Sequence, residues 1–215
     1  MNKQELIDFE NHIIEEYKKG ETPGPVHLSG GNEEQLLEIF KNIKDDDWVF
    51  TNHRSHYHAL LKSKDKEWLS KEILSGYSSH INSKKYKIFS SAIVGGCIPI
   101  ALGVALAIKR KGGRENIFCF LGDMAAHMGC FHESIKYAIG EKLPITFIIE
   151  DNNIGCNTPT KEVWKGYDIK HDKKIPHLIV YEYKRNKPHY GIDFANTFIK
   201  FKINGKTFNH NGGMY

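Results

Sequence analysis

Two short apolar segments on either side of a helical pattern constrain the fold of this chain more than any other feature. Residues 116–121 and 145–149 are almost wholly apolar, and each is short enough for a buried strand. Between them, apolar side chains recur at helical spacing at Phe131, Ile135, Ala138 and Ile139. A strand, a helix and a second strand in this order predict a parallel βαβ unit. We therefore expect an α/β fold in which a parallel sheet is flanked by helices.

The rest of the 215-residue chain adds elements of both kinds. The spacing of apolar residues predicts helices over residues 6–17, 36–43 and 67–74. Short apolar runs predict strands over residues 48–50 and 175–183. The length suffices for one domain with a buried core, and neither a repeat nor a long linker divides it. We predict a single domain over residues 1–203 and a flexible tail over residues 204–215, which are rich in Gly and Asn.

Residues 92–108 carry no charge and are mostly apolar. A membrane-spanning helix needs about 20 apolar residues, whereas Gly95, Gly96 and Pro99 interrupt the start of this run. The pattern favours a loop followed by a helix that is apolar on all sides. Such a helix is buried in a core or against another subunit.

Charge and cysteine usage exclude other classes of protein. The net charge is +4, and the lysines are scattered without a block of like charge, so we expect no nucleic-acid partner. The four cysteines form no CxxC pair, which argues against a cysteine metal site or a disulfide framework. The N-terminus has no apolar signal segment, and we expect a cytoplasmic protein without membrane contact.

Polar residues follow both strands of the predicted βαβ unit. Asp123 comes after the first strand and Asn152 after the second. Ligands bind beyond the carboxyl ends of parallel strands, and carboxylate and amide oxygens suit Mg²⁺ bound together with phosphates. Ala125 and Ala126 would allow a phosphate to approach the next helix closely. The same residues fit a second interpretation, in which Asp123 caps a helix and Asn152 begins a turn.

A resemblance to a known family decides between these two interpretations. Gly122-Asp123, followed 29 residues after the Asp by Asn152, resembles the thiamine-diphosphate motif. The whole of residues 122–134 and 142–152 resembles the alpha subunit of the 2-oxo acid dehydrogenase first component, the pyruvate, branched-chain and acetoin dehydrogenase group. Further segments match in the same order, namely residues 9–28, 53–56, 78–80 and 91–99. The resemblance covers residues 6–160, and it implies a thiamine-diphosphate-binding fold.

The resemblance implies a role for each matching position. It implies a metal site formed by the side chains of Asp123 and Asn152 and the backbone carbonyl of Ile154. It implies that thiamine diphosphate contacts a further set of residues, some through the main chain only: His53, Arg54, Ala92, Val94, Gly122, Ala125 and Asn152. His56 is a candidate acid/base on the substrate side. His189 is another, because residues 187–191 stand where the family has a His-rich loop.

The chain departs from the family pattern at four points. His53 replaces the family's aromatic residue before Arg54, and it can still form a hydrogen bond to a phosphate. Met124 replaces the second Gly of the motif, where a side chain could crowd the cofactor. Asp151 replaces the first Asn of a pair whose second member is the metal ligand in the family. The C-terminal part is shorter than in the family.

The family's activity implies a function and a partner for this chain. We expect an alpha-like subunit, inactive alone, that binds thiamine diphosphate and Mg²⁺ and decarboxylates and dehydrogenates a 2-oxo acid. A beta-like subunit would supply the Glu that activates the cofactor, and the default assembly is a heterotetramer. One alternative is a split transketolase-like or acyloin-forming carboligase subunit. Another is a non-catalytic binding or regulatory subunit, with Met124 marking a lost site.

Overall fold

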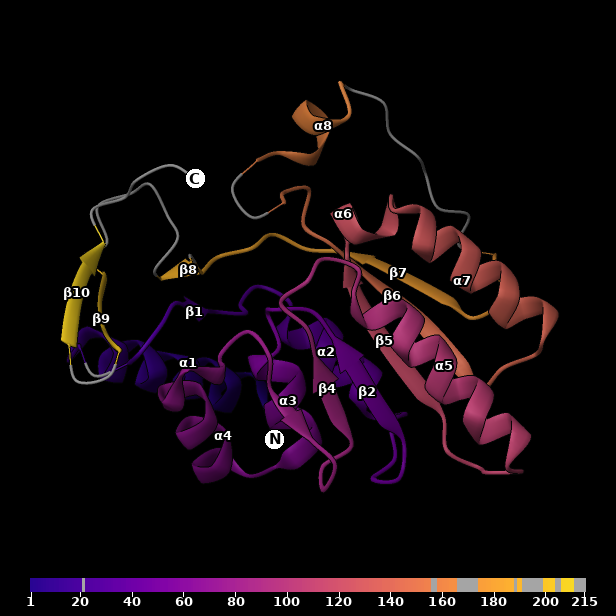
Figure 1. Cartoon of the computed structure of the whole chain (residues 1–215), viewed down its shortest axis with the longest axis horizontal. Helices are drawn as coiled ribbons and strands as arrows, with labels where there is room; N and C mark the ends of the chain where they lie inside the picture. The colour runs from indigo at the N-terminus through magenta and orange to yellow at the C-terminus, as the bar shows by residue number, and fades with distance from the viewer. Residues whose placement is uncertain are drawn as a thin grey trace.

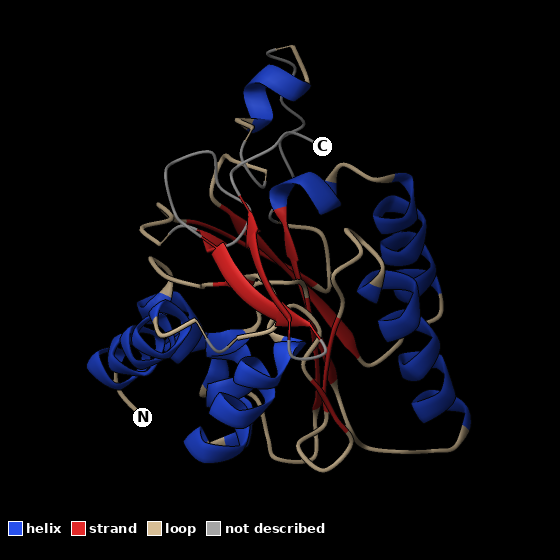
Figure 2. Cartoon of the chain, turned by 60° about the vertical axis from the view of Figure 1, so that its left-hand side comes forward, coloured by secondary structure: helices blue, strands red, loops and turns tan. Residues whose placement is uncertain are grey.

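The computed structural model describes residues 1–20, 22–155, 158–165 and 174–187, and the backbone of residues 189–190, 199–203 and 206–210. Its centre is a six-stranded sheet with helices on both faces, as Figures 1 and 2 show. Apolar side chains are buried on each face of the sheet, which makes a three-layer α/β fold. The predicted fold class is confirmed.

The strands of the main sheet stand in the order β3-β4-β2-β5-β6-β7. They are β2 (Trp48–Thr51), β3 (Asn82–Ser83), β4 (Ile88–Ser90), β5 (Ile117–Gly122), β6 (Ile145–Asp151) and β7 (Leu178–Glu182). Five of them run parallel, whereas β3 pairs antiparallel with β4. The predicted parallel sheet thus gains one antiparallel strand at this edge, where a short turn after β3 returns the chain alongside it.

Helices cover both faces of the sheet (Figure 2). One face carries α1 (Lys3–Lys18), α2 (Glu33–Phe40), α3 (His56–Ser63), α4 (Lys66–Glu72) and the π-helical turn η1 (Ile73–Tyr77). The other face carries α5 (Cys97–Arg110) and α7 (Gly129–Gly140). The first helix begins at a capping box, in which Asn2 and Glu5 satisfy each other's backbone N–H groups.

The predicted βαβ unit is present as β5, α7 and β6, with the single-turn helix α6 (Asp123–Ala126) between β5 and α7. The chain runs from β2 outward to β4 on one side, and then crosses through α5 to β5 on the other side of β2. This reversal is a topological switch point, and it opens a crevice at the carboxyl ends of β2 and β5. The fold thus selects this end of the sheet for a ligand.

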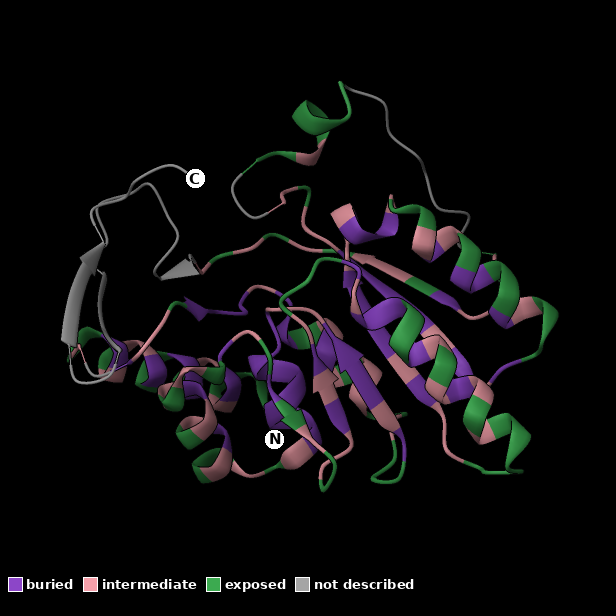
Figure 3. Ribbon diagram, viewed as in Figure 1, coloured by how far each residue is buried: buried purple, intermediate pink, exposed green. Residues whose placement is uncertain are grey.

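Only one side of α5 is buried within this chain. The helix packs Cys97, Ile98, Ala101 and Ala105 against the sheet, while Ile100 on the opposite side is 44% exposed. Figure 3 shows the buried and exposed stripes along α5. The predicted burial of this helix in a core holds for one side, and its contact with another subunit stays a prediction for the exposed side. No helix of the described residues is long and apolar enough to cross a membrane.

Short strands complete the described structure. The strand β1 (Val26–His27) pairs with β8 (His189–Tyr190), and β9 (Ile199–Ile203) pairs with β10 (Lys206–His210). The last strand lies inside residues 204–215, for which a flexible tail stays a prediction. The remaining helix is the single turn α8 (Thr160–Val163).

Candidate functional site

A pocket of about 310 Å³ lies at the carboxyl ends of the central parallel strands. The segments that follow β2, β5, β6 and β7 all contribute to its wall. It gathers eight of the residues selected from sequence: His53, Arg54, Val94, Gly122, Asp123, Ala125, Asn152 and Ile154. The pocket therefore unites positions that are about 100 residues apart in the chain.

Strand pairing brings the two predicted metal-binding side chains to the same edge of the sheet. Gly122 of β5 pairs with Glu150 of β6, so Asp123 and Asn152 leave adjacent strands. Asp123 is only 6% exposed and accepts a hydrogen bond from the hydroxyl of Thr160. Burial nevertheless raises the pKa of Asp123, and no cationic side chain of the described chain forms an ion pair with it. A carboxylate in this position favours a bound cation.

The turn after β6 shapes the second half of this edge. The backbone N–H of Ile154 donates to the side-chain Oδ1 of Asn152 at 3.1 Å, and Asn153 between them has a left-handed φ of 58°. The amide Nδ2 of Asn152 donates to the hydroxyl of Tyr183 at 2.9 Å. Among the described residues no three His, Cys, Asp or Glu side chains gather as metal ligands. The donors here are instead one carboxylate, one amide and a backbone carbonyl, which suit Mg²⁺.

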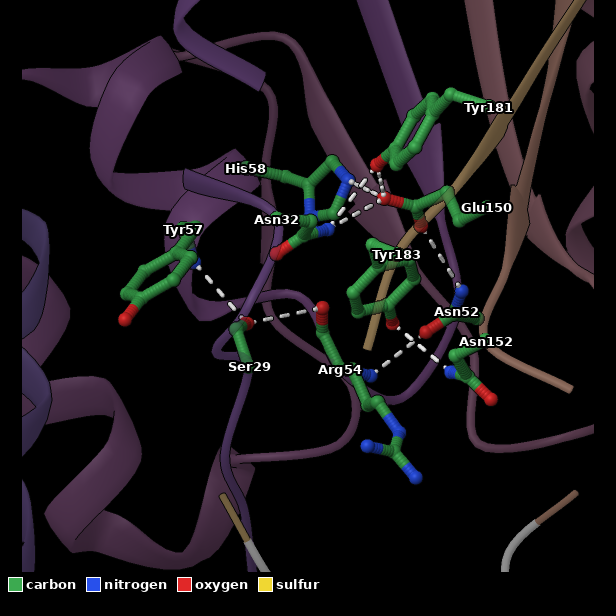
Figure 4. Close-up of polar contacts among 10 residues, drawn as sticks. All are labelled: Ser29, Asn32, Asn52, Arg54, Tyr57, His58, Glu150, Asn152, Tyr181 and Tyr183. Carbon is green, nitrogen blue, oxygen red and sulfur yellow. Dashed lines mark hydrogen bonds and ion pairs between the residues drawn. The ribbon is translucent and has the colours of Figure 1, made fainter. Parts of the chain in front are cut away.

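Arg54 reaches the pocket from the segment between β2 and α3. The residue is buried, its N–H donates to Asn52 Oδ1 at 2.8 Å, and its carbonyl accepts from the Ser29 hydroxyl at 3.3 Å. These contacts hold the backbone, and Figure 4 shows the guanidinium extending away from Glu150. A planar guanidinium at this point suits a diphosphate. Beside it, burial lowers the pKa of His53 to about 4, so its ring is neutral at pH 7.

The loop before α5 closes another part of the wall. Val94 lines the pocket, and Gly95 follows it with a φ of +72°. This left-handed φ favours glycine, and a Cβ at Gly95 would also stand 2.7 Å from Met128 Sδ, which would have to move. Ala92, which we expected to contact the cofactor through its main chain, precedes this turn and is not part of the pocket wall.

Glu150, which the sequence analysis did not assign, is buried and lines the pocket. Glu150 Oε1 accepts hydrogen bonds from Asn32 at 3.0 Å, His58 at 3.1 Å and Tyr181 at 2.5 Å. Its Oε2 accepts from Asn52 at 3.5 Å. We call these five residues the Glu150 cluster (Figure 4). Its signal in the sequence is a carboxylate that ends an apolar strand.

His56 lies in a different group, which we call the Glu10 cluster: Glu10, Ser29, His56 and Ser78. Its Nε2 is 2.9 Å from Ser78 Oγ, and its Nδ1 is 3.3 Å from Glu10 Oε1. The His56 side chain is fully buried and is not part of the pocket wall. The other acid/base candidate, His189, has its backbone in β8, and its side chain lies outside the described residues.

Two further residues complete the pocket wall. Met124 lines it beside Asp123, so the side chain that replaces the family's Gly does face the cavity. Tyr183 lines it from the end of β7. The rule that ligands meet the carboxyl ends of parallel strands would have selected Tyr183 too, had it been applied to the strand predicted over residues 175–183.

These features define an α/β protein with a pocket at the switch point of its sheet, lined by a carboxylate, an amide and a guanidinium. Comparison with known proteins identifies the family within this class. The model of the dehydrogenase E1 component family matches residues 1–180. The chain belongs to this family.

Curated relatives agree with this assignment. The alpha subunit of acetoin:2,6-dichlorophenolindophenol oxidoreductase from Bacillus subtilis is 33% identical over 72% of this chain and 50% of the relative. The subunit of the same name from Cupriavidus necator is 34% identical over 71% and 49%. The pyruvate dehydrogenase E1 component subunit alpha of Porphyra purpurea is 30% identical over 67% and 47%. The chain thus spans about half the length of these relatives.

A solved structure of a putative thiamin diphosphate-dependent enzyme from Mycobacterium smegmatis also matches. It covers 61% of this chain and 22% of its own, with a TM-score of 0.42 and 19% identity. This overlap is too partial to support a conclusion.

Proposed function

We propose that this chain binds thiamine diphosphate and Mg²⁺ as the alpha-like subunit of a two-subunit enzyme that decarboxylates and dehydrogenates a 2-oxo acid. The observation that carries the proposal is the pocket in which Arg54, Asp123, Asn152 and Ile154 meet. A guanidinium and three oxygen donors are what a magnesium diphosphate requires.

The residues fit this ligand in number and type. Asp123, the Asn152 amide and the carbonyl of Ile154 would hold the metal, and Arg54 would pair with the diphosphate. The backbone N–H of Ala125, in the first turn after Gly122, would donate to the same phosphates. When bound, thiamine diphosphate supplies a nucleophilic carbon that adds to the substrate carbonyl and holds the electrons of the cleaved bond.

The activating carboxylate would come from a beta-like partner subunit. The exposed side of α5 supports this part of the proposal, because Pro99, Ile100, Gly103 and Ala107 leave an uncharged surface uncovered in this chain. Exposed apolar surface of this kind marks a subunit contact. We infer a heterotetramer of two alpha-like and two beta-like chains.

An acyloin is a second candidate substrate. The two acetoin oxidoreductase subunits are 33% and 34% identical to this chain, against 30% for the pyruvate dehydrogenase subunit. Cleavage of an acyloin and decarboxylation of a 2-oxo acid both break a bond next to a carbonyl carbon, and both use the same cofactor half.

Titration calorimetry with thiamine diphosphate tests the proposal. We would run it with and without Mg²⁺, first on the chain alone and then with a beta-like partner. Binding that requires Mg²⁺ and is lost in Asp123→Ala is the expected result, since this substitution removes a charged metal ligand. Absence of binding with the partner present would favour a non-catalytic subunit instead.

A further inference from the structure

Tyr183 touches one of the expected metal ligands, although it is not itself a ligand. It follows β7, lines the pocket and is half-buried there. Side chains two residues apart on a strand lie on the same face, and the rings of Tyr181 and Tyr183 are 5.9 Å apart. The two hydroxyls have different partners, however. That of Tyr181 donates to Glu150, whereas that of Tyr183 accepts from the Asn152 amide at 2.9 Å.

The hydrogen bonds of Asn152 determine which way its amide faces. A backbone N–H can only donate, so the atom 3.1 Å from the N–H of Ile154 is the amide oxygen. The amide nitrogen must then face Tyr183, and Figure 4 shows the oxygen pointing away from that hydroxyl. An amide oxygen accepts two bonds. The one to Ile154 therefore leaves a second lone pair for a cation.

We propose that Tyr183 is a positioning residue for the metal site, whose hydroxyl holds the Asn152 amide with its oxygen directed to the cation. This inference rests on the proposed function, because it concerns how that site is built. Without the hydroxyl, the amide has one fixed contact instead of two and must be ordered when the metal binds. Residues that orient a metal ligand in this way typically change metal affinity by about 10- to 100-fold.

The chemistry of the hydroxyl suits this role. The Tyr183 side chain is an uncharged phenol that lines the pocket and meets the Asn152 amide nitrogen at 2.9 Å. A neutral phenol accepts from the Asn152 amide and keeps its own proton for a second bond. It holds the ligand without adding a charge beside the metal.

The experiment compares Tyr183→Phe with Tyr181→Phe. Each removes one buried hydroxyl from the same face of the same strand segment, and only the first touches Asn152. Thiamine diphosphate binding is followed by calorimetry over a series of Mg²⁺ concentrations. The sample is the chain alone if it binds the cofactor, and otherwise the chain with its beta-like partner. We expect Tyr183→Phe to raise the half-saturating Mg²⁺ concentration about tenfold or more, and Tyr181→Phe to change it less than about threefold. At saturating Mg²⁺, the cofactor affinity of Tyr183→Phe should equal that of the unchanged chain.

The Asn152→Ala background separates positioning from packing. There, adding Tyr183→Phe should cause no further change in the Mg²⁺ requirement, because no amide remains to be oriented. Equal Mg²⁺ requirements for Tyr183→Phe and the unchanged chain would overturn the inference and leave the proposed function intact. An unchanged chain that needs no Mg²⁺ or binds no cofactor would overturn both. Circular dichroism verifies that each variant is folded.

Discussion

The Glu10 cluster and the Glu150 cluster are both polar and largely buried, yet they present different groups to the pocket. The Glu150 cluster lines it with its carboxylate and with Asn32 and Asn52, whereas the Glu10 cluster reaches it only through Ser29. Each contains a carboxylate beside a histidine of α3: Glu10 lies beside His56, and Glu150 beside His58. Residues two apart on a helix point in nearly opposite directions. One short helix therefore supplies both clusters.

The difference shows that a buried acid and histidine do not by themselves identify a functional site. In the Glu10 cluster, His56 bridges Glu10 and Ser78 in an arrangement of serine, histidine and acid. All three side chains are fully buried, and none lines the pocket. The cluster connects α1, α3 and the segment after η1, and it therefore stabilises the fold. Both clusters contact the backbone of Arg54, the first through the Ser29 hydroxyl and the second through Asn52, but only the second lines the pocket with its carboxylate.

Replacing Glu10 with Ala should have the largest effect and should act mainly on stability, because Glu10 itself does not line the pocket. The N–H of Ser29 and the ring of His56 would both lose a buried acceptor. We expect the free energy of unfolding to fall by about 3 kcal/mol, measured by urea denaturation. Glu15→Ala, an exposed position on the same helix, is the control and should change it by less than about 0.5 kcal/mol. A loss of cofactor affinity in folded Glu10→Ala would break the distinction between the clusters.

His27 contacts the Glu10 cluster and the pocket wall, and the protein should lose stability in acid because of it. Its N–H donates to Ser78, and its ring meets that of His53 at 5.1 Å. Burial, with the nearby His53, lowers the pKa of His27 to about 3. The unfolded chain thus binds more protons below pH 6.5, and stability falls as the pH drops from there toward 3. His27→Phe should remove about 2 kcal/mol of this loss at pH 5. Equal pH slopes of unfolding for both proteins would contradict this.

Glu150→Gln should weaken both stability and binding. The NH2 of the new amide is a hydrogen-bond donor, and it would face Asn32, His58 and Tyr181, which are donors themselves. We expect the free energy of unfolding to fall by about 1.5 kcal/mol. Displacement of Asn52 would loosen the backbone of Arg54, so we expect about tenfold weaker thiamine diphosphate binding, or about 1.4 kcal/mol. The matched variant Glu10→Gln should reduce stability without changing affinity. If both variants changed affinity equally, the pocket would not distinguish the clusters.

The sequence predicted those parts of the fold whose pattern is periodic. The strands β5 and β6 and helix α7 were recognised because each has a single buried face or a short apolar run. Helix α3 was missed because residues 56–62 are all buried, which leaves no alternation with exposed positions. For the same reason the direction of each histidine on it could not be predicted, and His56 was selected over His58.

The site shows the same limit. Asp123 and Asn152 could be found because parallel strands bring their carboxyl ends together, and the family resemblance supplied Arg54. Glu150 and Tyr183 depend on hydrogen bonds between elements far apart in the chain. No local pattern records such pairings, which follow only from the packing of the sheet and its helices.

Met124→Gly should have the smallest effect, and it tests whether the pocket beside the Glu150 cluster is already shaped for its ligand. Met124 lines the cavity and lies in the single turn α6. Glycine there should lower the free energy of unfolding by about 0.5–1 kcal/mol, because it adds backbone freedom. If the side chain crowds the diphosphate, affinity for thiamine diphosphate should rise about threefold, which is about 0.6 kcal/mol. Met124→Ala separates the two effects, since it removes most of the side chain without the cost in backbone entropy. Weaker binding by both variants would mean that Met124 contacts the ligand favourably, and that the departure from Gly is part of a working site.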